Sequence, residues 1–329
     1  MSSNNQKFDS TFKATITGIK EALFPPKTDK ILAENDRIDG KTVLVTGSNT
    51  GLGFAIATKL AQRGGHIIMA VRSGIPEKGE EIQQLSGHKN VHMEFVELSD
   101  LQSIQDLVLR LKAQAITIDI LVCNAGMVSA GSKVAANGLD LMFAVNYLST
   151  FYFVNLLLKH EIIRPQNTPR PRLIFVSSES HRVDVPIDYK TFGKPIPYSA
   201  AKVVKFYGYY KLILNIFIVE LNRRYANNGD DLSIFTLCPG AVHSNISRHS
   251  PTLLKPILWL VFKAFFQTPV QASRPAVYFA CSPKMEGKTN LYLHMMQDKM
   301  MADPAYDAEN GREVWKASEQ LLAELGFAL

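Results

Sequence analysis

Thr46-Gly47-Ser48-Asn49-Thr50-Gly51-Leu52-Gly53 joins an apolar run, Thr42–Val45, to a segment of helical periodicity that begins near Gly51. In such a strand–loop–helix unit, Gly47 allows the tight turn and Gly51 lets the backbone approach a pyrophosphate closely. Gly53 allows the helix to pack on the strand, and the helix N-terminus then faces the phosphates. The stretch therefore predicts a dinucleotide-binding loop, with cofactor contacts from each residue of Gly47–Gly53.

Further short apolar runs follow this loop and alternate with helical patterns such as Gly53–Arg63 and Leu101–Ala115. The runs are His66–Val71, Val91–Val96, Ile118–Cys123, Arg172–Ser177, Leu232–Cys238 and a shorter one at Asn290–Leu293. Strand-like runs without polar alternation, separated by helices, are typical of a parallel sheet covered on both faces. We expect one α/β domain of the doubly wound (Rossmann) type, with a parallel sheet of about seven strands.

The organisation along the chain is that of a single domain with two flanking segments. Residues 1–40 contain Pro25-Pro26 and mixed charges, and we interpret them as an N-terminal arm. Residues 41–300 hold the predicted strands and helices without a repeat or a linker, and form the expected dinucleotide-binding and catalytic domain. Residues 301–329 are interpreted as a C-terminal helical extension of the same domain.

Composition excludes several classes of protein. Of 329 residues, 46% are hydrophobic and 20% are charged, as in an ordinary globular protein with a sizeable core. The net charge is +6, and no run of Lys and Arg is dense enough to indicate a nucleic-acid partner. We therefore expect neither bound nucleic acid nor a metal site.

Cysteine usage and the absence of targeting patterns bear on localisation. Cys123, Cys238 and Cys281 lie in apolar surroundings, and an odd number of cysteines argues against a disulfide framework. Residues 1–29 are polar where a signal peptide would be apolar, and no apolar run reaches the ~18 residues of a membrane span. We expect an intracellular protein, cytoplasmic or peripherally associated with a membrane.

The ends of the next strands supply further candidate cofactor contacts. The second strand ends at Arg72, where an acidic residue would favour NAD by binding the ribose 2′-hydroxyl. Arg72 can instead neutralise a 2′-phosphate, so we expect NADP rather than NAD, although an ordinary surface arginine is the alternative. The third strand ends at Glu97-Leu98, where a side chain can reach the adenine edge. The fourth ends at Asn124-Ala125-Gly126, whose small residues let the backbone pass under the cofactor.

Five motifs together make the chain similar to the short-chain dehydrogenase/reductase family over about residues 40–300. They are Thr46-Gly-x-x-x-Gly-x-Gly53, Asn124-Ala-Gly126, Asn146, Ser177-Ser178 and Pro239-Gly240, in the order and spacing of the family. Segments 176–182, 220–224 and 239–244 resemble most closely the retinol dehydrogenase and WW-domain-containing oxidoreductase members. The resemblance implies an NAD(P)-dependent oxidoreductase acting on CH–OH groups.

Two Tyr-x-x-x-Lys pairs compete for the role of proton donor and adjacent cation. Tyr198 precedes Lys202, and Tyr207 precedes Lys211. The helix, loop and strand that lead to Pro239 consume roughly 25–30 residues. Lys211 lies 28 residues before Pro239 (239 − 211), whereas Lys202 lies 37 before it (239 − 202). We therefore assign the catalytic pair to Tyr207 and Lys211, and interpret Tyr198 as part of an enlarged loop beside the substrate.

The expected chemistry is hydride transfer with Ser178, Tyr207, Lys211 and Asn146 as the site. Tyr207 is the general acid, and the Lys211 ammonium is expected to lower the pKa of its hydroxyl. Ser178 would hydrogen-bond the substrate oxygen. By resemblance, Lys211 also bonds the nicotinamide ribose and Asn146 completes a proton relay; a helix-distorting structural role for Asn146 is the alternative. Past the sixth strand, the expected nicotinamide contacts are Pro239, Gly240, Val242 and Ser244.

Residues 247–267 are rich in apolar side chains and, by resemblance, form a lid over the substrate. Such a lid suits a hydrophobic small molecule: a retinoid, steroid, isoprenoid or lipid aldehyde. With Lys255 and Lys263, residues 253–266 could also rest on a membrane surface, and an ordinary buried helix is the alternative. The family also implies a homodimer through the helices after the fourth and fifth strands. The competing function is a catalytically silent NADP(H)-binding protein that senses redox state or binds a partner.

Overall fold

A computed structural model describes residues 30–129, 131–199, 202–227, 232–242 and 267–329. Its eight strands are β1 (Thr42–Thr46), β2 (His66–Val71), β3 (Val91–Phe95), β4 (Ile120–Cys123), β5 (Arg172–Val176), β6 (Ser233–Cys238), β7 (Leu291–His294) and β8 (Gln297–Asp298). They form one sheet in the order β3-β2-β1-β4-β5-β6-β7-β8. The first seven strands pair in parallel, and β8 pairs antiparallel with β7.

The seven parallel strands confirm the predicted doubly wound sheet, and each lies within two residues of its predicted bounds. The sequence does not predict β8, because a two-residue strand carries no periodicity. The strand order reverses between β1 and β4. Connections leave these two neighbouring strands in opposite directions, so a crevice opens at their carboxyl ends, where doubly wound folds bind ligands.

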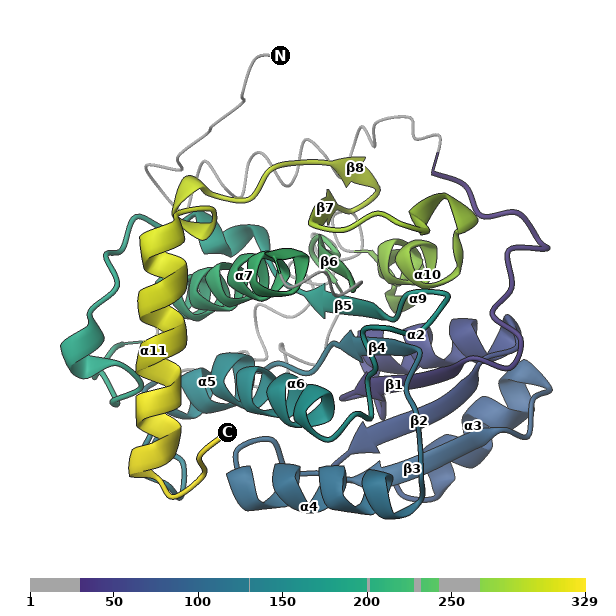
Figure 1. Cartoon of the computed structure of the whole chain (residues 1–329), viewed down its shortest axis with the longest axis horizontal. Coiled ribbons are helices and arrows are strands. Elements are labelled where there is room, and N and C mark those ends of the chain that lie inside the picture. Colours follow the sequence, from purple (N-terminus) through teal and green to yellow (C-terminus); the bar gives the residue numbers. More distant parts are fainter. Residues whose placement is uncertain (1–29, 130, 200–201, 228–231, 243–266) are drawn as a thin grey trace, which may run out of the picture.

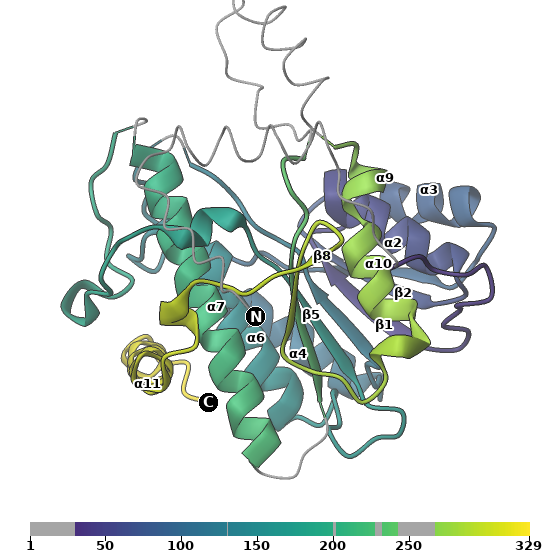
Figure 2. The same ribbon diagram turned by 90° about the horizontal axis from the view of Figure 1, so that it is seen from above.

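Helices cover both faces of the sheet, as Figures 1 and 2 show. One face carries α2 (Gly51–Gln62), α3 (Glu77–Ser86), α9 (Pro269–Ala272) and α10 (Arg274–Cys281). The other carries α4 (Leu101–Ala113), α5 (Leu141–Phe143), the π-helical turn η1 (Ala144–Leu148), α6 (Ser149–Lys159) and α7 (Val203–Asn227). Each face has its own buried apolar cluster, which is why the strand residues are apolar on both sides.

The short helices lie in the connections. They are η2 (Glu179–Arg182), η3 (Tyr189–Thr191), η7 (Pro283–Met285) and η8 (Asp303–Ala305). Asp100 illustrates how local sequence sets a helix boundary: its side chain accepts a hydrogen bond from the backbone of Gln102 and caps the N-terminus of α4.

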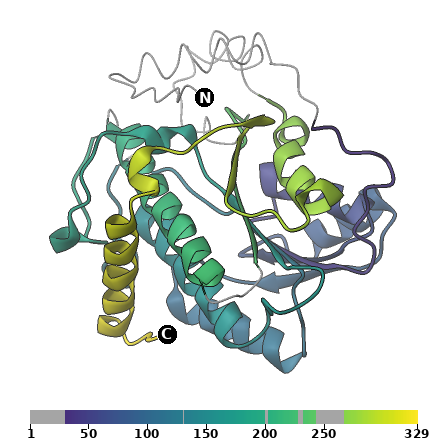
Figure 3. The same ribbon diagram turned by 45° about the horizontal axis from the view of Figure 1, so that its top comes forward.

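The C-terminal helix α11 (Ala308–Glu324) packs on the outer side of α6 and α7, which Figure 3 shows beside it. Trp315 is its main anchor, because its ring packs edge-on against Phe151 at 5.1 Å and also contacts Phe217 at 5.8 Å. The hydroxyl of Tyr147 lies 2.5 Å from that of Ser318, and both residues are fully buried. The outer face of α6 and α7 is therefore partly covered by the chain's own C-terminal segment.

Within the described ranges, Leu141–Lys159 is long and apolar enough to cross a membrane. This segment runs through α5, η1 and α6, and 78% of its most apolar 18-residue window is buried in the protein interior. A core helix of that kind passes the same test of length and composition. Several predictions lie outside the described residues: positions 1–29 of the arm, Ser244, the apolar segment 253–266 and all but the last residue of the lid 247–267.

Candidate active site

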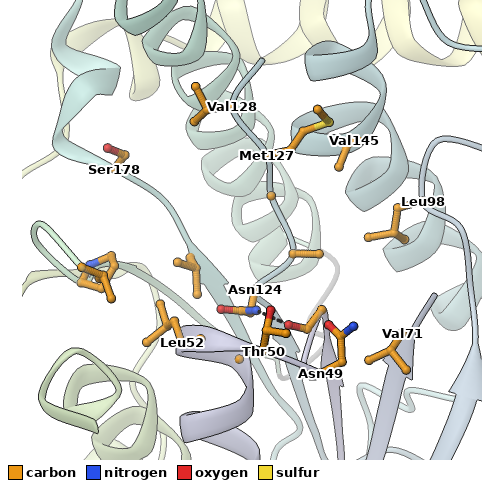
Figure 4. A pocket seen from close by; sticks show the side chains of 18 of the residues that line it. Asn49, Thr50, Leu52, Val71, Leu98, Asn124, Met127, Val128, Val145 and Ser178 are labelled. Carbon is orange, nitrogen blue, oxygen red and sulfur yellow. Dashed lines mark hydrogen bonds between the residues drawn. The ribbon is translucent and has the colours of Figure 1, made fainter. Parts of the chain in front are cut away.

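A cavity of about 540 Å³ lies at the carboxyl ends of the strands, where the strand order reverses. Loops that follow β1 to β6 all contribute to its wall. Figure 4 shows Asn49, Thr50 and Leu52 on one side of the cavity and Met127 and Val128 on the opposite side. The cavity therefore joins the glycine-rich loop to the region of the proposed catalytic residues.

Positions 47 and 53 of the glycine-rich loop must be glycine, because other atoms lie too close to them for a side chain. Gly47 has a φ of 63°, and a Cβ there would meet the Cα of Ala125 at 3.0 Å. A Cβ on Gly53 would lie only 2.4 Å from the carbonyl oxygen of Gly47. Side chains at either position would push the loop off the strand ends, so the loop presents bare backbone to the cavity. This cradle fits the pyrophosphate of a dinucleotide.

Asn124 braces the loop from the neighbouring strand. Its Nδ2 donates hydrogen bonds to the carbonyl oxygens of Thr46 and Gly47, at 2.9 and 3.2 Å. The hydroxyl of Thr46 in turn accepts from the backbone N–H groups of Asn124 and Ala125. The motif predicts a backbone role for Asn124, and its side-chain role is additional. A polar residue at a strand end, next to a loop rich in free carbonyls, is the signal that points to it.

Ser48 is the one described residue of Gly47–Gly53 that does not line the cavity. It is fully buried, and its hydroxyl donates to the carbonyl oxygen of Val45 at 3.0 Å. The side chain thus tightens the turn. A cofactor contact from Ser48 stays a prediction, because its hydroxyl is directed into the turn and it does not line the cavity.

Arg72 and Glu97 lie together in the wall of the cavity. Their side chains form an ion pair with 3.4 Å between Nη1 and Oε2, and the Arg72 side chain is 71% exposed. Glu97 also accepts hydrogen bonds from the backbone and hydroxyl of Ser99. These bonds from Ser99 and the charge of Arg72 hold the pKa of Glu97 below its usual value, although partial burial acts most strongly and in the opposite sense.

Tyr207 and Lys211 lie one turn apart on α7, and both line the cavity. Lys211 is 2% exposed, and its Nζ donates a hydrogen bond of 2.9 Å to the carbonyl oxygen of Val176. The same Nζ lies 5.9 Å from the ring centroid of Tyr207. Ser178 lines the cavity too, and its hydroxyl lies close enough to that of Tyr207 to lower the pKa of the phenol. The structure thus brings three of the four predicted catalytic side chains together.

Burial controls the ionisation of this pair. It raises the pKa of Tyr207 far above the usual value, and the neighbouring Ser178 hydroxyl opposes this only in part. Burial also lowers the pKa of Lys211 to about 8. The pKa of Tyr207 is therefore raised and not lowered as expected, because loss of solvation is the largest influence on it. The phenol is protonated at neutral pH, as a proton donor must be.

Asn146 lies behind the cavity wall and does not line it. Its side-chain amide pairs with the backbone of Met127: Oδ1 accepts from N at 2.7 Å, and Nδ2 donates to O at 2.8 Å. It sits in the π-helical turn η1, a distortion that is frequent at functional sites. A Cβ on Gly126 would lie 3.0 Å from Asn146 Oδ1 and 3.7 Å from Lys211 Nζ. Asn146 and Lys211 therefore converge on Gly126.

Tyr198 lies in the irregular segment before α7 and is not among the described residues that line the cavity. Its ring stacks on Phe206, with 4.6 Å between centroids and 23° between planes. Burial, then the charge of Asp140, raises the pKa of Tyr198 to about 12. Only the second of the two Tyr-x-x-x-Lys pairs faces this cavity.

Past β6, Pro239, Gly240 and Val242 line the cavity as expected. Sequence reasoning missed a group of lining residues that lie at strand ends, just after them, or on α5 and η1. They are Ala70, Val71, Val96, Ser99, Met127, Val128, Leu141, Val145, Val176, Ser177 and Cys238. Position relative to the strand ends could have identified most of them, whereas Leu141 and Val145 depend on how the helix packs. Within the described residues, no group of His, Cys, Asp and Glu is arranged to hold a metal ion.

A glycine cradle at one end of a cavity, with a protonated phenol, a hydroxyl and a buried amine at the other, suits nucleotide-dependent oxidoreductase chemistry. The chain belongs to the short-chain dehydrogenase family, whose model matches residues 41–252. It is an oxidoreductase that acts on CH–OH groups.

Individual relatives agree with this membership. The chain is 31% identical to retinol dehydrogenase 13 from Homo sapiens, over 94% of this chain and 92% of that protein. It is also 31% identical to the WW domain-containing oxidoreductase of Homo sapiens, over 87% of this chain and 69% of that protein. Among solved structures, angucycline C-6 ketoreductase LanV with bound NADP aligns with a TM-score of 0.59 at 23% identity, over 79% of this chain and 95% of that one. That likeness shows the fold.

Proposed function

We propose that this chain is an NADP-dependent oxidoreductase that interconverts a carbonyl and an alcohol on an apolar small molecule. The observation that carries the proposal is the shared cavity: Tyr207 and Lys211 lie in the same 540 Å³ space that the glycine-rich loop opens. Retinoids, steroids, isoprenoids and lipid aldehydes are the substrate class. The name of the relative retinol dehydrogenase 13 supports the retinoid as a first choice.

The cofactor choice is supported by the charge at the end of β2. Arg72 lines the cavity there, and no carboxylate stands at that strand end to bind a ribose 2′-hydroxyl. Glu97 neutralises part of the Arg72 charge through the 3.4 Å ion pair. A bound 2′-phosphate would take the place of Glu97 as the partner of Arg72. The similar ketoreductase LanV has NADP bound. Residues 47 and 49–53, with 124–126, would hold the rest of the dinucleotide.

The proposed residue roles follow from the atoms in the cavity. Bound NADPH supplies the hydride that reduces the carbonyl carbon. The hydroxyl of Tyr207 donates its proton to the carbonyl oxygen, and the hydroxyl of Ser178 hydrogen-bonds the same oxygen as charge develops there. Lys211, when protonated, favours the phenolate that remains, and Asn146 belongs to the path that returns a proton to it. In the oxidative direction, the Tyr207 phenolate is the general base.

The apolar part of the cavity supports an apolar substrate. The wall includes the hydrophobic side chains of Met127, Val128, Leu141 and Val145. Figure 4 shows Met127, Val128 and Val145 on the side opposite the glycine-rich loop. Val128 is 38% exposed, so apolar surface continues to the rim of the cavity. Such a wall binds a hydrocarbon body and leaves the reacting oxygen at the polar end.

The proposal includes an intracellular location, which the three cysteines support because all are buried free thiols. We retain the arm 1–40, the domain 41–300 with its lid 247–267, and the extension 301–329 as proposed units. Peripheral membrane contact through 253–266 and a homodimer stay predictions.

An activity screen tests the function directly. The purified chain is assayed for NADPH and NADH oxidation with retinal, steroid, isoprenoid and small aromatic carbonyls. We expect turnover of apolar carbonyls with NADPH, and at least tenfold less with NADH. Tight NADPH binding without turnover of any carbonyl or alcohol would contradict the proposal and favour the catalytically silent redox-sensing protein.

A further inference from the structure

The turn η2, Glu179–Arg182, comes directly after Ser178 and is tied to the end of the sheet by a buried carboxylate. Glu179 accepts hydrogen bonds from the Tyr292 hydroxyl at 2.5 Å, Lys299 Nζ at 2.6 Å and Arg182 Nε at 3.0 Å. Its side chain is 18% exposed. Three donors on one largely buried carboxylate make a rigid attachment, so the turn cannot shift without breaking charge-assisted hydrogen bonds.

His181 ties the same turn to the segment that follows β8. Its ring is fully buried, and Nε2 accepts a hydrogen bond from the backbone N–H of Ala302 at 3.0 Å. Because a backbone N–H can only donate, Nδ1 carries the ring proton and donates it to the carbonyl oxygen of Ser178 at 2.6 Å. The backbone N–H of His181 donates to the same oxygen at 3.1 Å. The backbone of Ser178 is thus fixed by two bonds from one residue.

Gly208, next to Tyr207, is where α7 touches this turn. A Cβ on Gly208 would lie 2.2 Å from the carbonyl oxygen of Ser180 and 2.7 Å from Cγ1 of Val183. The first distance is far inside van der Waals contact and involves a backbone atom. Since the turn is held by Glu179 and His181, the helix would have to move away, taking Tyr207 and Lys211 with it.

We propose that Gly208 and His181 are positioning residues that together set the separation between the hydroxyls of Ser178 and Tyr207. His181 fixes the backbone that carries Ser178, and Gly208 lets the helix that carries Tyr207 approach it. Both hydroxyls must reach one carbonyl oxygen in the proposed reaction, so this inference rests on the proposed function. Neither residue touches the substrate or the cofactor.

The first test is Gly208→Ala, with Lys205→Ala on the same helix as the matched control, because Lys205 is exposed. We expect Gly208→Ala to lower kcat by ~10- to 100-fold, as a displacement of about 1 Å does. KM and the dissociation constant of NADPH should change much less than kcat, because the glycine-rich loop is untouched. A crystal structure of the variant should show a longer distance from Tyr207 Oη to Ser178 Oγ. An unchanged distance would overturn the inference, whatever the activity.

The second test is a pair of substitutions at His181. His181→Phe keeps a ring but removes both side-chain hydrogen bonds, whereas His181→Asn can restore the donor to the Ser178 carbonyl oxygen. We expect kcat to fall at least tenfold in the first and to recover in part in the second, with NADPH affinity unchanged. Equal kcat in both variants and the wild type would contradict the role of His181. If the wild type itself shows no turnover, the proposed function fails. The distance from Tyr207 Oη to Ser178 Oγ, compared between crystal structures of the wild type and Gly208→Ala, still tests the positioning.

Discussion

The ammonium of Lys211 donates its 2.9 Å hydrogen bond to the carbonyl oxygen of Val176, the last residue of β5. This bond ties α7 to the strand that continues into Ser178. It therefore fixes the position of the helix that carries Tyr207 relative to the strand that leads to Ser178. It also holds a charged group in a site with almost no solvent. The ionisation of Lys211 should therefore be visible in the reaction.

Activity in the reductive direction should depend on the protonation of Lys211. Burial lowers the pKa of this amine to about 8, so its charge is present below pH 8 and is lost as the pH rises through that value. The Tyr207 hydroxyl stays protonated over the same range, because burial raises its pKa. We expect kcat/KM to be level from pH 6 to 7 and to decline about tenfold per pH unit above about 8. A level pH profile up to pH 9.5 would contradict this role.

Replacing Arg72 with alanine should change the cofactor preference. The side chain is 71% exposed and bound only to Glu97 at 3.4 Å among the described side chains, so it can be removed without disturbing the core. Loss of a charge-assisted contact to the 2′-phosphate costs roughly 1.5–3 kcal/mol, which raises the Kd of NADPH about 10- to 100-fold. The Kd of NADH should not change, and Lys78→Ala is the surface control. An equal rise in the Kd of NADPH and of NADH would show that Arg72 does not bind the 2′-phosphate.

Acid should destabilise the protein in two stages. Burial lowers the pKa of His181 to about 4. Between pH 6.5 and 4 the unfolded chain therefore binds a proton at His181 that the folded chain does not bind, and stability falls as the pH is lowered through this range. Glu179 has its pKa held at about 2 by Arg182, His294 and Lys299 against the cost of burial, so its contribution is lost as the pH falls from 4.5 toward 2. Urea unfolding of the wild type and His181→Phe at pH 7 and 5 checks the first stage. The variant should lose less stability over that interval.

The C-terminal helix should depend on Trp315. This side chain is 6% exposed and packs against Phe151 and Phe217. The guanidinium of Arg224 stacks over its ring, with 3.9 Å between Cζ and the ring centroid. We expect Trp315→Ala to lower the free energy of unfolding by about 3–5 kcal/mol, whereas the exposed Lys316→Ala changes it by less than about 0.5 kcal/mol. Urea denaturation measures both. A small effect of Trp315→Ala would mean that α11 contributes little to the packing of α6 and α7.

The sheet could be predicted from the sequence because each strand is a short apolar run between helices. The glycine-rich loop and the strand-end segments are equally local, and so the sequence alone predicts the segments that line this part of the cavity. The spacing between Lys211 and Pro239 favours the second Tyr-x-x-x-Lys pair as the catalytic pair. In the structure Tyr207 and Lys211 lie on α7, and both line the cavity.

What could not be predicted depends on contacts between distant residues. The bonds of Glu179 join residues 113 and 120 positions away, and no local pattern records them. Asn146 lies in a π-helical turn, and its amide pairs with the backbone of Met127, which is 19 positions away in the sequence. Burial of Tyr207 and Lys211 is a property of the assembled core, and it reverses the expected direction of the tyrosine pKa. The inward orientation of Ser48, by contrast, comes from a local hydrogen bond to the carbonyl oxygen of Val45, three positions away.

The most direct test compares Tyr207→Phe with Tyr198→Phe in NADPH-dependent reduction of an apolar carbonyl. Removing the Tyr207 hydroxyl should lower kcat by at least 100-fold, with NADPH affinity within about twofold of the wild type, because the ring and the glycine-rich loop remain. Tyr198→Phe should keep kcat within about threefold, since Tyr198 stacks on Phe206 outside the cavity wall. Loss of turnover in Tyr198→Phe alone would contradict the account and move the chemistry to the other tyrosine.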